Sequence, residues 1–85
     1  SYDLAWSRES AQIKGYESEV AGDADIMVVP NITAGNILGK SLIYAANAKM
    51  AGFIVGAQVP IVLTSRGAST QEKYLSLAIS ASAVK

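Results

Sequence analysis

The sequence predicts an α/β fold, in which helices cover the faces of a β-sheet. Three short apolar runs are the expected strands: residues 25–29 (DIMVV), 51–56 (AGFIVG) and 59–64 (VPIVLT). Continuous apolar runs of this length are typical of strands that are covered on both faces. These runs alternate with segments that carry helix signals, and such alternation is typical of a layered α/β sheet.

The first expected helix and the first expected strand both have clear boundaries. Residues 7–14 (SRESAQIK) form the expected helix, since Ser7 can cap its start and Gly15 stands where helices often end. The strand at residues 25–29 is closed by Pro30, which has no backbone N–H for a sheet.

A long helix and two further strands follow. Thr33 or Asn36 is expected to cap the helix, which runs to about Met50. The last two strands are separated only by Ala57 and Gln58. A connection this short is too short for a crossover, so the two strands are expected to be antiparallel neighbours or one bent pair.

The final expected helix begins at Ser69 and has the sequence STQEKYLSLAISASAVK. Its first residues form a capping box, in which the Ser69 hydroxyl accepts a backbone hydrogen bond and Glu72 can reach back. Glu72 therefore has a structural role available without any chemistry.

Composition excludes several classes of site. The 85 residues contain no cysteine and no histidine, so thiolate metal sites and histidine-dependent triads are excluded. The seven basic and seven acidic residues balance, which gives no attraction to nucleic acid or acidic membranes. No membrane span or secretory signal is expected, so the expected location is the cytoplasm. The apolar fraction of 51% is high for so short a chain, and predicts apolar faces that pack on protein outside this sequence.

Residues 34–41 (AGNILGKS) fit the loose form of the phosphate-loop pattern of nucleotide-binding proteins. A phosphate loop needs non-helical backbone whose N–H groups converge on phosphates. Ile37 and Leu38 are bulky and apolar, and suit a helix better than a solvated loop. A nucleotide-binding site around Lys40 therefore remains the less favoured interpretation.

The junction between the first expected strand and the long helix is an alternative ligand site, which does not require a nucleotide. It lies at the carboxyl end of a strand, where open α/β sheets bind ligands, and a helix begins there. Asn31, Thr33 and Asn36 can contact a polar or anionic substrate at this point. All three are equally suited to being helix caps and turn formers.

A second junction, LTSRGASTQE at residues 63–72, carries Ser65 and Arg66. A guanidinium beside a helix start is a good bidentate partner for phosphate or carboxylate. The competing interpretation is that Arg66 extends into solvent or pairs with Glu72.

Three spaced blocks give the chain a family resemblance. VAGDADIMVVPNITAGN, AGFIVGAQVPIVLTSRG and the closing helix resemble the C-terminal part of the phosphate acyltransferases, the phosphate acetyl- and butyryltransferases. The stretches VPN and VPIVLTSR resemble the butyryl branch of the family more closely than the acetyl branch. On this resemblance, residues 1–85 are an incomplete C-terminal part of such an enzyme.

The resemblance implies an enzyme that moves an acyl group, butyryl or acetyl, between coenzyme A and inorganic phosphate and forms an acyl phosphate. It implies a three-layer α/β sheet of the isocitrate and isopropylmalate dehydrogenase type, in two domains, and a homodimer. The partners are acyl-CoA and phosphate, coenzyme A is a substrate, and no cofactor or metal is required. The fragment alone is expected to be inactive.

Catalytic roles also follow from the resemblance. A Ser-Arg pair and an Asp seven residues after the Ser are implicated in the acetyl branch. Ser65 and Arg66 match the pair, whereas Glu72 stands at the Asp position. Arg66 and Ser65 would stabilise the phosphate and an oxyanion, and Glu72 would be the base. A non-catalytic α/β fragment that docks a partner chain is the alternative function.

Overall fold

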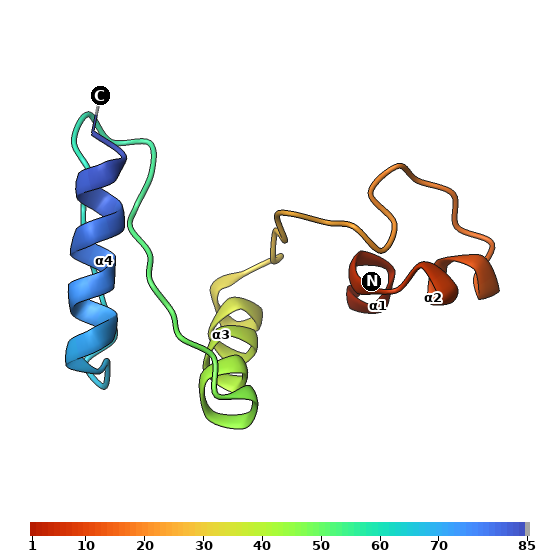
Figure 1. Ribbon diagram of the computed structural model, residues 1–85, viewed down its shortest axis with the longest axis horizontal. Helices are drawn as coiled ribbons and strands as arrows, with labels where there is room; N and C mark the ends of the chain where they lie inside the picture. The colour runs from red at the N-terminus through yellow and green to blue at the C-terminus, as the bar shows by residue number, and fades with distance from the viewer. Residues whose placement is uncertain (85) are drawn as a thin grey trace. The chain divides into compact units, whose positions relative to one another are not determined.

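The computed structural model describes residues 1–84, in which the regular structure consists of helices and one isolated β-bridge. The chain divides into two units, Ser1–Gly35 and Asn36–Lys85. The helices (Figure 1) are α1 (Tyr2–Trp6), α2 (Arg8–Ile13), α3 (Ile32–Ala46) and α4 (Thr70–Ser82).

Helix α2 begins and ends as its sequence predicts. The Ser7 hydroxyl accepts a hydrogen bond from the backbone N–H of Ser10 at 3.0 Å, which satisfies one of the free donors of the first turn. After the helix, Gly15 has a φ of 66°, a left-handed conformation that glycine adopts without strain. Helix α1 has no side-chain cap and was not expected from the sequence.

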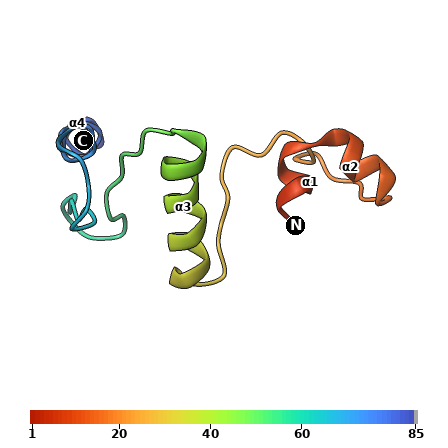
Figure 2. The same ribbon diagram turned by 90° about the horizontal axis from the view of Figure 1, so that it is seen from below.

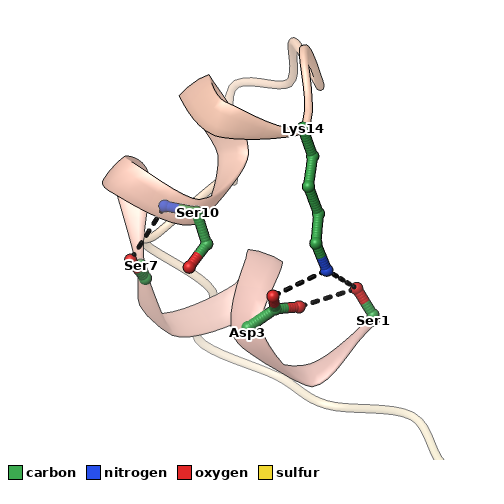
Figure 3. A network of polar contacts seen from close by, with 5 residues as sticks. All are labelled: Ser1, Asp3, Ser7, Ser10 and Lys14. Atoms are coloured by element: carbon green, nitrogen blue, oxygen red, sulfur yellow. Dashed lines mark hydrogen bonds and ion pairs between the residues drawn. The ribbon is translucent and has the colours of Figure 1, made fainter.

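A small polar network joins the two helices of the first unit (Figure 3). The ammonium group of Lys14 lies 2.6 Å from a carboxylate oxygen of Asp3, and the Ser1 hydroxyl donates to the other oxygen at 2.7 Å. The hydrogen bond from Lys14 is the main reason why the pKa of Asp3 falls from 3.8 to about 2. This network therefore links the end of α2 to the start of α1.

The segment after α2 folds back onto α1 at Gly22. The backbone N–H of Gly22 donates to the carbonyl of Leu4 at 2.7 Å. Gly22 has a φ of 73°, and a Cβ atom there would lie 2.6 Å from the backbone nitrogen of Arg8. Glycine is therefore required here by both backbone conformation and space. Ala11 is the buried hydrophobic residue of this unit.

The first expected strand is not formed within the described residues. Residues 25–29 have no β-partner there, and the side chains of Ile26 and Val28 are 81% and 91% exposed. The expectation that both faces of this run are covered is therefore wrong for residues 1–84. Met27 and Val29 are partly buried, and a Cβ on Gly35 would approach the side chain of Val29 to 3.1 Å.

Helix α3 starts earlier and stops earlier than expected. The side-chain oxygen of Asn31 accepts a hydrogen bond from the N–H of Ala34 at 2.9 Å, so Asn31 is the cap. The prediction that Thr33 or Asn36 caps this helix is wrong, since both lie inside it. The helix does not reach Met50, because Asn47 adopts a φ of 55° directly after its last residue. Figure 2 shows α3 along its length as one uninterrupted helix.

The two later apolar runs meet at one residue pair. Ile54 and Ile61 form an antiparallel bridge, with a hydrogen bond of 2.8 Å from the Ile54 N–H to the Ile61 carbonyl. This confirms antiparallel pairing at that point. No longer ladder is formed in residues 1–84, so the expected sheet strands are extended segments here, and the three-layer sheet stays a prediction.

Helix α4 begins as its capping box predicts, since the Ser69 hydroxyl accepts from the N–H of Glu72 at 3.1 Å. It ends at Ser82 with Ala83 as its C-cap, which is shorter than the expected helix. The last residue of that expected helix, Lys85, lies outside the described residues.

The extended segment before α4, which includes residues 51–64, runs along that helix (Figure 1). The side chains of Ser76 and Ser80 are the buried side chains of this unit, at 1% and 6% exposure. The Ser76 hydroxyl also accepts a hydrogen bond from the N–H of Gly52 at 3.2 Å. The small side chains of Ser76 and Ser80 let the backbone of this segment approach the helix closely.

Candidate active site

The Ser65-Arg66 pair lies in a tight turn directly before α4. The N–H of Ala68 donates to the carbonyl of Ser65 at 3.0 Å, which closes a four-residue turn. The Ser65 hydroxyl accepts a weaker hydrogen bond from the N–H of Gly67 at 3.4 Å. Because the hydroxyl is the acceptor in this contact, its own hydrogen remains available to donate to a ligand.

Arg66 and Glu72 are not paired with each other. The Arg66 side chain is exposed and forms no ion pair within residues 1–84. Glu72 is partly buried in the first turn of α4, where an acidic side chain is favourable for the helix. Its backbone N–H is capped by Ser69, but its carboxylate accepts no hydrogen bond in the described part of the chain. The return half of the expected capping box is therefore absent from residues 1–84.

One cleft of about 510 Å³ brings the three predicted catalytic residues together. The turn and the start of α4 form one wall, with Ser65, Arg66 and Glu72. Helix α3 forms the opposite wall. The lining residues that α3 contributes are Lys40, Ile43 and Tyr44. The sequence does not predict that these two walls meet, because they are about 25 residues apart in the chain.

Glu72 also lines a second, smaller cleft of about 180 Å³. This cleft extends toward the end of α3 and includes Lys49, Met50 and Leu75. Glu72 therefore stands on the boundary between two hollows, with one lysine in each. Lys49 belongs only to the smaller one.

The three predicted substrate contacts all lie at the start of α3, and Asn36 is the one that adjoins the cleft. The side-chain oxygen of Asn31 is used as the cap of α3, and Thr33 lies exposed in the first turn of that helix. Both belong to the first unit, whereas the cleft belongs to the second. Asn36 lines a shallow groove on α3 that shares Lys40 and Tyr44 with the cleft. Of the three, Asn36 is the one that the structure connects to the candidate site.

The phosphate-loop interpretation fails on backbone conformation. Residues 34–41 lie entirely within α3 (Figure 2), so their N–H groups are committed to the helix and cannot cradle a phosphate. The lysine of that motif nevertheless lines the cleft beside Arg66. Sequence reasoning set Lys40 aside together with the motif, and so missed it as a site residue.

Metal-holding clusters and membrane-crossing helices are both absent from the described residues. Within residues 1–84, no group of His, Cys, Asp and Glu side chains is arranged to hold a metal ion. In the same residues, no helix combines the length and apolar character needed to cross a membrane.

Comparison with known proteins identifies the family. The family model described as phosphate acetyl/butaryl transferase matches residues 1–81. The chain belongs to this family. The resemblance inferred from the sequence blocks is thereby confirmed, and the match includes Ser65, Arg66 and Glu72.

Members of both branches of the family are similar to this chain. A phosphate acetyltransferase of Thermotoga maritima is 52% identical over 93% of this chain and 27% of its own length. A phosphate butyryltransferase of Clostridium acetobutylicum is 47% identical over 93% of this chain and 26% of its own length. The chain thus spans about a quarter of the curated relatives it matches. The two branches match almost equally, so the closer resemblance to the butyryl branch stays a prediction.

A solved structure matches the described conformation. A branched-chain phosphotransacylase from Enterococcus faecalis V583 is 51% identical and aligns with a TM-score of 0.82. The alignment covers 95% of this chain and 30% of that one. The helices and extended segments of this chain therefore have the same arrangement as a segment of that structure.

Proposed function

We propose that this chain carries part of the active site of a phosphate acyltransferase. The proposed reaction moves an acyl group between coenzyme A and inorganic phosphate. The observation that supports it is the single cleft that joins Ser65, Arg66 and Glu72 in a chain of this family. These are the residues to which the family resemblance assigns catalytic roles.

The chemistry fits the three side chains. A phosphate oxygen attacks the thioester carbonyl and forms a tetrahedral intermediate. The C–S bond then breaks, and the leaving sulfur takes a proton from protonated Glu72 and departs as coenzyme A. The intermediate carries an oxyanion, which the Ser65 hydroxyl can stabilise by donating its free hydrogen. Arg66 can hold the phosphate with two parallel hydrogen bonds. In the reverse direction, the Glu72 carboxylate accepts the thiol proton of coenzyme A.

The site residues outside the cleft have weaker support. Asn36 lines the adjoining groove, so it is proposed as an outer substrate contact. Asn31 and Thr33 are better explained as part of the start of α3. A homodimer and a cytoplasmic location stay predictions from the resemblance.

An assay of thiol release tests the proposal. The full-length enzyme is expected to release coenzyme A from butyryl-CoA or acetyl-CoA only when phosphate is present. Arg66→Ala should lower kcat/KM by roughly 10²- to 10³-fold, the usual loss when a transition-state donor is removed. Lys73→Ala is the matched control, because Lys73 is an exposed cation of α4 that does not line the cleft. Near-normal turnover of Arg66→Ala would show that the assigned role is wrong.

A further inference from the structure

Lys40 is a cation of the cleft that the family assignment and the catalytic proposal leave unused. It lies on α3, its side chain is exposed, and it lines both the cleft and the adjoining groove. Within residues 1–84 it forms no ion pair, since the salt bridges there join other residues. Its charge is therefore available to a ligand of the cleft.

The charges of the cleft favour a phosphate-bearing ligand. Lys40 and Arg66 contribute two positive charges and Glu72 contributes one negative charge. The chain as a whole is neutral, so this excess of positive charge is local. Tyr44, Ser65 and Ser69 also line this cleft, and each has a hydroxyl group that can donate a hydrogen bond to a phosphate oxygen. Two cations suit a dianionic phosphate group better than the single charge of a carboxylate.

We propose that Lys40 is a second phosphate-binding residue of this site, acting from α3 across the cleft from Arg66. This inference rests on the function proposed above. The two cations have different geometries: the planar guanidinium of Arg66 suits bidentate contact, and the ammonium of Lys40 acts as a point charge on a long stem. A phosphate group between the two walls would be neutralised from both sides.

The bound phosphate group has two sources in this reaction. It is either the inorganic phosphate that reacts or a phosphate of coenzyme A. Both present the same chemistry to Lys40, and steady-state kinetics distinguish them. A contact with inorganic phosphate raises the KM for phosphate, whereas a contact with coenzyme A raises the KM for the CoA substrate.

The first experiment measures both KM values and kcat in the full-length enzyme. Lys40→Met removes the charge but keeps an unbranched apolar stem, and should raise one of the two KM values roughly 10- to 100-fold. Lys40→Arg restores a cation and should recover most of that loss. Lys49→Met is the matched control, because Lys49 lines only the smaller cleft, and it should leave both KM values unchanged.

The outcomes separate this inference from the proposed function. If the wild-type enzyme shows no phosphate-dependent thiol release, the proposed function fails. If the wild type is active and Lys40→Met keeps both KM values, the proposed function stands and the role of Lys40 is wrong. If Lys40→Arg gives no recovery, the effect of Lys40→Met comes from packing and the inference is also overturned.

A second experiment needs no substitution. An amine-reactive reagent labels the lysines of the wild-type enzyme, and peptide mass spectrometry follows Lys40 and Lys73 separately. Saturating phosphate or coenzyme A should slow the labelling of Lys40 at least several-fold and leave exposed Lys73 unchanged. Equal labelling of Lys40 with and without both ligands would overturn the inference, even if the variants do not fold.

Discussion

The two functions considered for Glu72, in the helix start and as a base, can be separated at the level of single residues. Its backbone N–H is satisfied by Ser69, while its carboxylate is free of hydrogen bonds within residues 1–84 and lines the cleft. The cap of α4 therefore depends on Ser69, and the carboxylate is not needed for it. This favours a chemical role for the Glu72 side chain.

Glu72→Gln tests that separation in the full-length enzyme. The amide cannot accept the thiol proton, so turnover should fall roughly 10²-fold or more. The unfolding midpoint should stay near that of the wild type, because the backbone contact with Ser69 is kept. Ser69→Ala provides the comparison and should cost about 1 kcal/mol of stability. If Glu72→Gln kept normal turnover but lowered the unfolding midpoint, the Glu72 side chain would have a role in the helix alone.

At the scale of elements, the ion pair between Lys14 and Asp3 is expected to make stability depend on pH. Lys14 holds the pKa of Asp3 at about 2, below its usual 3.8. The ionised form is thus favoured in the folded state. The stabilising contribution of this pair is present above pH 3.8 and is lost as the pH falls through about 2. Because both side chains are substantially exposed, the contribution is expected to be small.

An NMR titration of the Asp3 carboxyl carbon measures this directly in the full-length protein. At pH 3, Asp3 should still be ionised in the wild type and largely protonated in Lys14→Met, whose midpoint should return toward 3.8. A wild-type midpoint near 3.8 would contradict the contact. Arg8→Met is the control, because Arg8 faces Asp23 at the longer distance of 3.8 Å.

The elements differ in how well the sequence predicts them. Helices α2 and α4 follow from local signals, since each has a serine that caps its own first turn. The cap of α3 was misplaced because Asn31, Thr33 and Asn36 are all good cap residues and only tertiary structure selects one. Strand pairing depends on partners that are distant in the sequence. The apolar runs therefore predict extended backbone, but they do not predict which segments it hydrogen-bonds to.

The candidate site was predictable in part for the same reason. Ser65, Arg66 and Glu72 lie within eight residues of one another, and the turn that joins them to α4 is local. Lys40 joins them only because α3 lines the same cleft as that turn, which no pattern in the sequence predicts. The phosphate-loop pattern that contains Lys40 does indicate phosphate binding, but that pattern requires a loop, and these residues form a helix.

At the scale of the whole chain, burial is very limited. Ala11 is the buried hydrophobic residue among residues 1–84, while 21 large hydrophobic side chains are exposed. The sequence prediction that apolar faces pack on protein outside this chain agrees with this exposure. The relatives, of which this chain spans about a quarter, have the additional length to supply such surfaces.

The isolated 85-residue chain is therefore expected not to fold cooperatively. Too little apolar surface is removed from water to offset the entropy lost on ordering the backbone. Thermal unfolding followed by circular dichroism should show no sharp transition, and sedimentation should show aggregates. A stable dimer with a sharp transition would contradict this expectation and favour the alternative of an interaction fragment. The full-length enzyme, measured in the same way, is the control.

The position of Glu72 has a consequence for any substitution made there. Glu72 lines both the larger cleft and the smaller cleft. A change of this side chain therefore alters the walls of two hollows at once, whereas a change at Arg66 alters the larger one and a change at Lys49 the smaller one.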